Sequence, residues 1–312
     1  MIGGNGAADG GDGGDGGDGG DGGDAGGGGT IARLSSGPIR PIGVSPALKQ
    51  PRHEYWWRGN KWPPEGLGSW TNSTTKKFPR HYWTPYYYSI SIIGDFVQAK
   101  LPSGLTWDKI DLTSYLKKAK VEKELKELSE LVDYRAGVMT EALAQRGNLE
   151  NYWCGVLMFN KNSHPCTFDL TQVGVRIGQF QSMHYKRKFN RPRPSQLSPA
   201  LLPPIEVPGH ASYPSGHATE SHLTAYLLGE VMPAAASTPA NKDLKSRPAK
   251  GDPNSTPLLQ MAQRITRNRE VMGLHYPSDS EAGRHLARAT FELLKRCAVI
   301  KQLLADAKQE WA

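Results

Sequence analysis

Residues 186–194 read KRKFNRPRP, a run of five basic residues that ends in alternating arginine and proline. The segment before it, residues 168–188, carries apolar residues at helical spacing: Val173, Val175, Ile177 and Phe180. Proline removes a backbone donor and clashes inside a helix, so the predicted helix ends where the prolines begin. Basic residues at a helix C-terminus are favourable through the helix dipole, and in isolation this accounts for the run.

Helical patterns continue on both sides of this run. Apolar residues at helical spacing, separated by polar or charged ones, predict helices over residues 113–146, 168–188, 216–232, 255–268 and 278–312. The Pro, Ala and Lys content of residues 233–254 predicts a loop. The sequence therefore predicts an all-α fold, a helical bundle over residues 111–312. No stretch approaches 18 uncharged apolar residues, so we expect no transmembrane helix.

The first 30 residues form a tail rich in glycine and aspartate. Aspartate recurs at every third position: Asp9, Asp12, Asp15, Asp18, Asp21 and Asp24. The repeat has no apolar side chain to bury and would lose much backbone entropy on folding, which predicts a disordered linker. Calcium binding, as in glycine-aspartate repeat proteins, is the alternative, but a period of three does not match the nine-residue β-helix repeat.

Residues 31–110 are rich in aromatic residues and turn formers, and we expect an irregular segment packed on the helical core. Six of the eight tryptophans lie in it: Trp56, Trp57, Trp62, Trp70, Trp83 and Trp107. Within it, residues 86–93 favour a short strand. Large apolar rings usually pin such a segment to a core, whereas a platform for carbohydrate or nucleobases is the alternative.

The charge balance indicates an anionic partner. The formal net charge is +8, and the six aspartates of residues 1–24 face no basic residue there, so the rest of the chain stands at +14. A phosphorylated substrate, nucleic acid or an anionic lipid surface fits such a balance. The alternative is that the basic residues only coat solvated helix faces.

Cysteine usage and the N-terminus bear on the compartment. Cys154, Cys166 and Cys297 include no close pair, so neither a disulfide framework nor a structural zinc site is expected. The N-terminus lacks the basic and apolar regions of a secretory signal. We expect a soluble protein, cytoplasmic by default, with export left open.

A second motif, PSGH at residues 214–217, stands at the start of a predicted helix. Free amide groups and a partial positive charge at a helix start attract an anion. Ser215 can donate its hydroxyl, Gly216 lets the backbone approach a ligand, and the dipole favours proton release from His217. An ordinary serine N-cap beside an incidental histidine fits the motif equally well.

A third motif, REVMGLHYPSD at residues 269–279, supplies Arg269, His275 and Asp279. An imidazole that acts as a nucleophile or ligand needs its second nitrogen oriented, and a carboxylate does this by accepting the N–H bond. The Tyr-Pro-Ser between the two residues predicts a turn that enters a helix, with Asp279 in its first turn. The alternative for Asp279 is a first-turn acid that pairs with the helix dipole, and the alternative for His275 is a structural histidine.

The three motifs together supply the parts that phosphoryl transfer needs. These are cations around three equatorial oxygens, an in-line nucleophile and an acid for the leaving group. Lys186, Arg193 and Arg269 are the cations, and a guanidinium fork matches phosphate oxygens in pairs.

In this order and spacing, the motifs resemble the signature of the type 2 phosphatidic acid phosphatase and vanadium haloperoxidase superfamily. The resemblance covers residues 165–290 and departs at Asn268, where the family usually has serine. It implies a helical bundle and a metal-free mechanism without a cofactor. His275, oriented by Asp279, would attack phosphorus, and His217 would protonate the leaving oxygen and then serve as base. The resemblance assigns the oxyanion to Lys186, Arg193, Ser215, Gly216 and Arg269.

Two enzymatic functions remain after this comparison. In the haloperoxidase branch the same cradle holds vanadate at the residue matching His275, and the reaction is peroxide-dependent halide oxidation. Haloperoxidases usually carry an aromatic residue just before the first-motif arginine, but Pro192 stands there, as in soluble acid phosphatases. We favour a phosphatase that acts on a small phosphomonoester or lipid phosphate, with the haloperoxidase as the alternative.

A third class is a non-enzymatic binder of anionic partners. Such a protein need not carry His217, His275 and Asp279 together, so this interpretation is the weakest, and no nucleic-acid partner is expected. The sequence does not decide whether His210 is a pocket residue or a loop histidine without a role.

Overall fold

The computed structural model describes residues 78–237 and 256–312, and within them the chain forms helices and no strand. The predicted all-α class is confirmed for these residues. The glycine-aspartate tail, the first four tryptophans of the aromatic segment and most of the predicted loop lie outside the described residues. From Trp83 onward the described chain belongs to one compact unit, and residues 78–82, with the 3-10 helix η2 (Arg80–Tyr82), belong to another.

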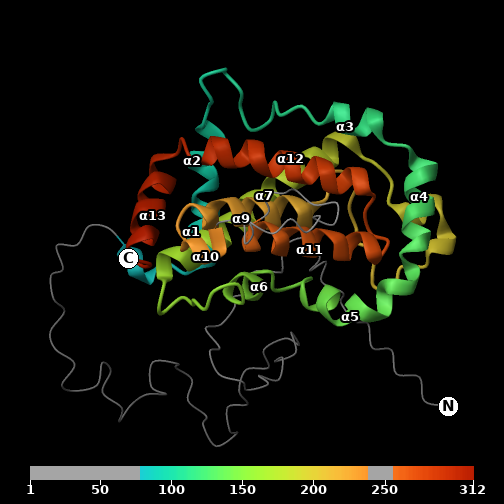
Figure 1. The fold of residues 1–312 in the computed structure, drawn as a ribbon. Helices are drawn as coiled ribbons and strands as arrows, with labels where there is room; N and C mark the ends of the chain where they lie inside the picture. Colours follow the sequence, from blue (N-terminus) through green and yellow to red (C-terminus); the bar gives the residue numbers. More distant parts are fainter. Residues whose placement is uncertain (1–77, 238–255) are drawn as a thin grey trace, which may run out of the picture. The chain divides into compact units, whose positions relative to one another are not determined.

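The larger unit consists of helices of very different lengths (Figure 1). In chain order these are α1 (Pro85–Ser91), α2 (Ile93–Gln98), α3 (Thr113–Lys118), α4 (Val121–Glu130), η3 (Val132–Tyr134), α5 (Arg135–Ala144), α6 (Glu150–Cys154), α7 (Pro165–Phe189), α8 (Pro194–Leu197), η4 (Pro199–Leu201), α9 (Gly216–Gly229), α10 (Ala234–Ser237), α11 (Pro257–Val271), α12 (Pro277–Leu294) and α13 (Ala298–Gln309).

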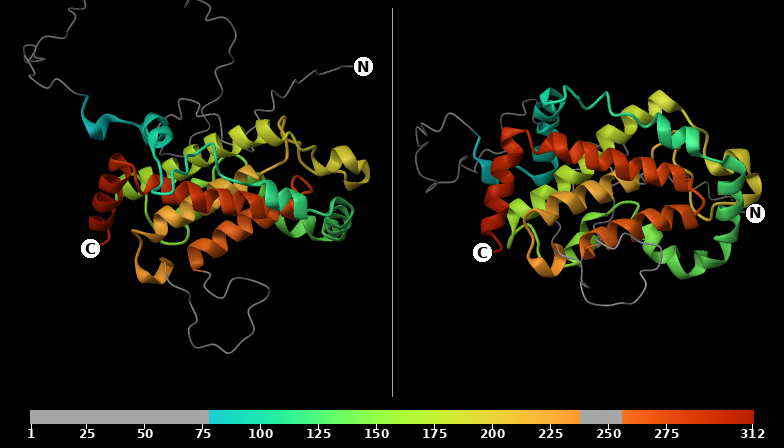
Figure 2. Two further views of the ribbon diagram at one scale, coloured as in Figure 1. Left: turned by 90° about the horizontal axis from the view of Figure 1, so that it is seen from above. Right: turned by 45° about the horizontal axis from the view of Figure 1, so that its top comes forward.

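Helix α9 packs against α7, α11 and α12, and nearly all of its residues are buried (Figures 1 and 2). Glycines allow this close packing. A Cβ atom on Gly178 of α7 would lie 2.8 Å from the Cα atom of Glu220, and one on Gly283 of α12 would lie 2.7 Å from the carbonyl oxygen of Ser215. The backbones of α7 and α12 therefore approach that of α9, and the starts of α9 and α12 are held together.

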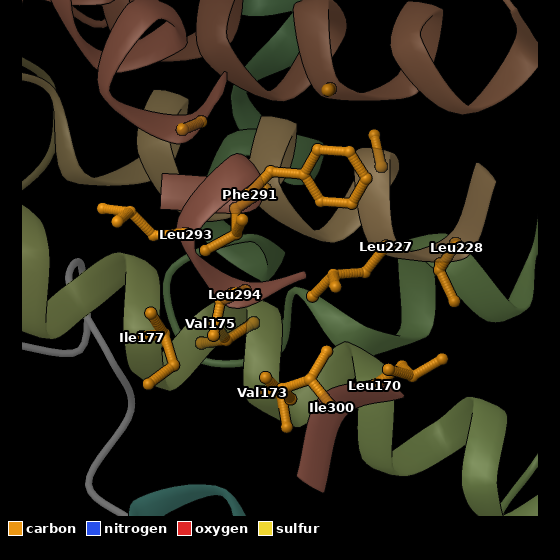
Figure 3. Close-up of a cluster of buried hydrophobic side chains, with 14 of the residues drawn as sticks. Leu170, Val173, Val175, Ile177, Leu227, Leu228, Phe291, Leu293, Leu294 and Ile300 are labelled. Atoms are coloured by element: carbon orange, nitrogen blue, oxygen red, sulfur yellow. The ribbon is translucent and has the colours of Figure 1, made fainter. Parts of the chain in front are cut away.

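The main hydrophobic core lies between α7, α9, α12 and α13. Figure 3 shows ten of its side chains, each at most 3% exposed: Leu170, Val173, Val175, Ile177, Leu227, Leu228, Phe291, Leu293, Leu294 and Ile300. Burial of each such aliphatic or aromatic side chain stabilises the fold by about 1.5–3 kcal/mol. A smaller cluster, with Ala142, Ile205 and Leu274, packs α5 and a loop against the segment after α11.

The predicted short strand at residues 86–93 is wrong, because this segment forms α1 after its first residue and reaches the first residue of α2. Thr84 is the N-cap of α1, with its side chain accepting from the Tyr87 amide at 3.5 Å, and Pro85 takes the first helical position. Proline at that position favours a helix start. The aromatic and branched side chains indicated a strand, but the local start signal is the stronger determinant here.

The pattern over residues 113–146 corresponds to α3, α4, η3 and α5 rather than to one continuous helix. Ala119 and Lys120 have extended backbone between α3 and α4. Apolar spacing identifies helical residues but not such breaks, because each short helix has an apolar face of its own. Helices α7, α9 and α11 begin and end within a few residues of the predicted ranges, whereas the predicted range 278–312 is divided into α12 and α13.

The packing interpretation of the tryptophans is confirmed for Trp107. Its ring lies 5.0 Å from that of Phe180 and 4.8 Å from that of His184. Its carbonyl oxygen accepts from Gln181 Nε2 and Tyr185 Oη, both at 3.2 Å. This irregular segment is therefore attached to α7 by both rings and hydrogen bonds.

In the part of the chain that the structure describes, none of the helices combines the length and the apolar character needed to cross a membrane. The three cysteines, all of which are described, are free thiols. Burial raises the pKa of Cys166 to about 12, and the charge of Glu310 adds to this effect.

The start of α7 is capped by a residue far away in the chain. The N-cap residue His164 makes no side-chain capping bond, but the carboxylate of Glu310 accepts from the amides of Cys166 at 2.7 Å and Thr167 at 2.8 Å. It also accepts from Thr167 Oγ1 at 2.7 Å. The negative charge lies where the helix dipole favours it.

Glu310→Gln is therefore expected to lower the free energy of unfolding by about 1–2 kcal/mol, because the amide has one acceptor oxygen and no charge. Urea unfolding followed by circular dichroism measures this change. Glu281→Gln, on an exposed face of α12, is the control and should change stability by less than about 0.5 kcal/mol. Equal effects of the two substitutions would contradict the capping role.

A buried histidine makes the stability depend on pH. His222 of α9 is 2% exposed, and its Nδ1–H donates to the Ala218 carbonyl at 2.9 Å. Burial lowers its pKa to about 4, despite the opposing effect of that hydrogen bond. Because the folded pKa lies below the unfolded value of about 6.5, the unfolded state takes up the proton first as the pH falls.

We expect the stability that depends on neutral His222 to be complete above pH 6.5 and to be lost between pH 6.5 and 4, by roughly 3 kcal/mol. Urea unfolding at a series of pH values measures the slope. His222→Gln should flatten it in that window, whereas the exposed His285→Gln should not. A slope that is unchanged in His222→Gln would show that other groups cause the loss.

Candidate active site

The predicted site residues stand at helix ends that meet. Lys186 is in the last turn of α7, Arg193 precedes α8, and Ser215 is the N-cap of α9. Arg269 is in the last turn of α11, while His275 and Asp279 flank the start of α12. The amide of Ser215 donates to the Asp279 carbonyl at 3.0 Å, which joins the starts of α9 and α12 directly.

His275 and Asp279 form a buried pair. His275 Nδ1 lies 3.1 Å from Asp279 Oδ2, as the spacing of the third motif led us to expect. The same oxygen accepts from Ser212 Oγ at 2.5 Å and from the Tyr276 amide at 3.1 Å. With the proton on Nδ1 directed at the carboxylate, the lone pair of His275 is on Nε2.

The electrostatics of this pair keep the imidazole neutral. Burial lowers the pKa of His275 well below its usual range, and the charge of Arg193 lowers it further. Burial alone would raise the pKa of Asp279, but the hydrogen bond with His275 and the attraction of Arg191 outweigh this and bring it to about 2. At neutral pH the site thus holds a neutral imidazole beside an ionised carboxylate, the state in which a histidine is nucleophilic.

Arg193 lies directly against this histidine. Its Nη1 is 3.1 Å from His275 Nε2 and donates to the Leu274 carbonyl at 3.0 Å. Its Nε donates to the His210 carbonyl, and its Nη2 is 3.0 Å from His210 Nδ1. His210, which the sequence left open, is therefore a half-buried contact of the Arg193 guanidinium.

The other two cations are held by carbonyl oxygens. Lys186 Nζ donates to Ala211 at 2.9 Å and to Ser212 at 3.3 Å. Arg269 Nη2 donates to the carbonyl of Ala142 and, at 3.3 Å, to Gln145 Oε1. Both side chains are 1% exposed, so their charges are fixed within the protein.

The PSGH motif begins α9 in the predicted way. Ser215 Oγ accepts from the Ala218 amide at 3.3 Å, so the serine acts as an ordinary N-cap. His217 is 2% exposed, and its Nε2 lies 3.1 Å from the Gln145 carbonyl oxygen, to which it donates. Gly216 is the first helical residue.

His217, Arg269 and His275 line one small cavity. Its volume of about 10 Å³ is enough for one water molecule. Arg146 and Glu206 also line it and form an ion pair at 3.3 Å. Of the predicted residues, Lys186, Arg193, Ser215 and Gly216 do not line this cavity. Arg193 contacts His275, and the Ser215 amide donates to the Asp279 carbonyl.

Several contacts of the site were not predicted from the sequence. Arg191 binds Asp279 Oδ1 at 2.6 Å, and Glu124 binds Arg191 at 3.1 Å. Ser212 and Gln145 contact Asp279 and His217, respectively. The alternating Arg-Pro run was a signal for Arg191. Nothing in the sequence relates Glu124 to Arg191, 67 residues away, or Gln145 to His217, 72 residues away.

None of the known protein-family models matches this chain. In the described ranges, no group of three or more His, Cys, Asp or Glu side chains is arranged to hold a metal ion. The residues of the site are therefore the basis for assigning its chemistry.

Proposed function

We propose that this chain is a phosphatase that hydrolyses a phosphomonoester through a phosphohistidine on His275. The observation that supports it best is the buried neutral imidazole, with Nδ1 held by Asp279 and Nε2 against the Arg193 guanidinium. Arg193 contacts this imidazole, Arg269 lines the same cavity, and the charge of Lys186 also lowers the pKa of His275. The carboxylate of Asp279 can balance the positive charge that the nucleophile gains. This combination matches what phosphoryl transfer requires.

In the first step, His275 Nε2 attacks phosphorus, and the N–P bond forms as the bond to the leaving oxygen breaks. Asp279 stabilises the imidazolium that results. The leaving oxygen takes a proton from His217. His217 enters this step as the imidazolium; since its Nε2–H donates to the Gln145 carbonyl, the transferred proton is the one on Nδ1.

In the second step, water attacks the phosphohistidine and His217 takes the proton of that water. The N–P bond breaks, inorganic phosphate leaves, and both histidines return to their initial states. Lys186, Arg193 and Arg269 would bind the three equatorial oxygens throughout. Guanidinium groups suit this task because their N–H donors match pairs of oxygens.

Substrate binding requires rearrangement of the cavity, which has room for about one water molecule. The Arg146–Glu206 pair at its edge has side chains that are 25% and 56% exposed. Such a pair contributes roughly 0–1 kcal/mol, so its opening costs little. Arg193 would at the same time exchange its contact with His275 Nε2 for a phosphate oxygen.

The haloperoxidase alternative uses the same donors. One imidazole nitrogen and the charges of Lys186, Arg193 and Arg269 fit a vanadate ion as well as a phosphoryl group. Bound vanadate would supply peroxide activation. Pro192, in the position before Arg193, is the sequence feature that favours the phosphatase.

Vanadate is expected to inhibit hydrolysis of p-nitrophenyl phosphate competitively, at a concentration at least about 100-fold below that of phosphate for the same effect. The reason is that a trigonal-bipyramidal oxyanion gains an axial bond to His275 and resembles the transition state. Steady-state inhibition gives both constants, and vanadium NMR measures binding independently of turnover. Chelator should leave hydrolysis intact.

The same preparation decides between the two enzymes. Vanadate-loaded protein that brominates an indicator dye with peroxide, faster than it hydrolyses phosphate esters, would replace the phosphatase by the haloperoxidase. His275→Ala should lose the preference for vanadate over phosphate. Absence of vanadate binding to the folded protein would contradict both functions.

A further inference from the structure

The carboxylate of Asp279 is held from both of its oxygens. Oδ2 accepts from His275, Ser212 and the Tyr276 amide, whereas Oδ1 accepts from Arg191 Nη1 at 2.6 Å. Without Arg191, the bonds described to Oδ2 would leave the carboxylate free to tilt about that oxygen. The contact with Arg191 therefore fixes the plane of the Asp279 carboxylate, which in turn orients His275.

Arg191 is itself fixed from several sides. Its Nη2 donates to Glu124 Oε2 at 3.1 Å, and its Nη1 also donates to Ser278 Oγ at 2.7 Å. Its guanidinium lies 3.8 Å from the centre of the Tyr276 ring, at cation–π distance. Since Arg191 is 7% exposed, it has little freedom to take another orientation.

Glu124 connects this group to α4. It accepts from the Ser278 amide at 2.7 Å and from Ser278 Oγ at 3.0 Å, in the first turn of α12. It is 8% exposed and borders a surface groove that is also lined by Pro277 and Ser278 of α12. The series Glu124, Arg191, Asp279 and His275 thus runs from near the surface to the nucleophile, and the charge alternates over its first three residues.

We propose that Glu124 and Arg191 are positioning residues for the nucleophile: through Asp279 they fix the orientation and the Nδ1–H tautomer of His275. This inference rests on the phosphatase function proposed for the site. Outer partners of this kind hold a histidine in metal sites, where their removal typically costs 10–100-fold in affinity or activity. The same factor is expected here on kcat, because Glu124 and Arg191 do not touch the substrate.

A purely structural role for the buried ion pair is the competing explanation, since loss of one partner of such a pair is strongly destabilising. The chain offers a matched control. Glu310, like Glu124, is a carboxylate that accepts from a backbone amide and a hydroxyl in the first turn of a long helix, and it has no contact with the site. Glu310→Gln therefore repeats the chemical change of Glu124→Gln away from His275.

The experiment compares Glu124→Gln, Arg191→Lys and Glu310→Gln with the wild-type chain, each verified as folded by near-ultraviolet circular dichroism. With p-nitrophenyl phosphate, the first two variants should lose about tenfold or more in kcat, with KM within about twofold, whereas Glu310→Gln should retain kcat. The double variant of Glu124→Gln and Arg191→Lys should lose little more than the worse single variant, because the two residues act in one series.

Proton and nitrogen NMR of histidine-labelled protein gives a readout without turnover. The Nδ1–H resonance of His275, assigned by its absence in His275→Ala, should shift or broaden in Glu124→Gln and Arg191→Lys and stay unchanged in Glu310→Gln. If both variants keep kcat and this resonance, or if Glu310→Gln loses as much as they do, the positioning role is wrong. If the wild-type chain hydrolyses no phosphate ester, the phosphatase proposal fails, and the resonance alone still tests the positioning of His275.

Discussion

His275→Ala should abolish turnover, with kcat for p-nitrophenyl phosphate reduced by roughly 10⁴-fold or more, as expected when a covalent nucleophile is removed. The reason is that His275 lines the cavity and is the histidine whose Nδ1 pairs with a carboxylate, which can balance the positive charge gained on attack. Arg193, Lys186 and Arg269 are cations that lack a lone pair for attack on phosphorus. Acid quenching with radiolabelled substrate should trap a phosphoenzyme in the wild-type chain and none in the variant.

The control for this substitution is His222→Ala, which removes another buried histidine without a contact to the predicted cradle. It should leave a trapped phosphoenzyme in whatever fraction of the protein is folded. Added imidazole should restore part of the activity of His275→Ala, because it can occupy the vacated space beside Asp279. A phosphoenzyme that forms in His275→Ala at the wild-type level would assign the nucleophile elsewhere.

The pH profile offers a check on the same residue. Because burial and the charge of Arg193 lower the pKa of His275, its neutral form persists below the range in which an ordinary histidine takes up a proton. Loss of kcat/KM near pH 6.5 would therefore have to come from another group or from the substrate. Protonation of His275 should not cause a loss of kcat/KM near pH 6.5.

Some helices could be predicted from the sequence and others could not, for identifiable reasons. Helices α7, α9, α11 and α12 were predicted because apolar spacing, proline and capping serine or threonine give local start and stop signals. Helix α1 was not, because the Tyr and Ile content of residues 86–93 is typical of strands and conceals a helix that Thr84 and Pro85 begin. Composition over a few residues is a weaker guide than a cap in that segment.

The contacts of the candidate site likewise include some that local sequence spacing predicts and others that depend on the folded structure. The contacts of His275 with Asp279, and the location of Ser215 at a helix start, follow from sequence spacing of four residues or fewer. The roles of Glu124 and Gln145 depend on hydrogen bonds from α4 and the end of α5 to the first turns of α12 and α9, and no local pattern contains that information. The small cavity, likewise, depends on the loop with Glu206, whose path only the folded structure gives.

The largest effect after that of the nucleophile is expected at His217. His217→Ala should lower kcat/KM for alkyl phosphates by roughly 10²–10⁴-fold, the usual contribution of a general acid, but much less for p-nitrophenyl phosphate. An alkoxide leaves poorly without a proton, whereas p-nitrophenolate is stable enough to leave unprotonated. A series of esters with leaving groups of graded pKa measures the dependence, which should be steeper in the variant.

His210→Ala is the control that separates acid catalysis from general damage to the cradle. His210 contacts the Arg193 guanidinium, so its loss should weaken binding of the phosphoryl group to a similar extent for every leaving group.

In His217→Ala, by contrast, the trapped phosphoenzyme should still form from p-nitrophenyl phosphate but should break down slowly, because the base for water is missing. Equal losses on good and poor leaving groups in His217→Ala would rule out its role as the acid. The Nε2 contact of His217 with the Gln145 carbonyl would then be structural. The proton for the leaving oxygen would have to come from another donor that lines the cavity, and Arg146, although it lines the cavity, is too weak an acid for this role.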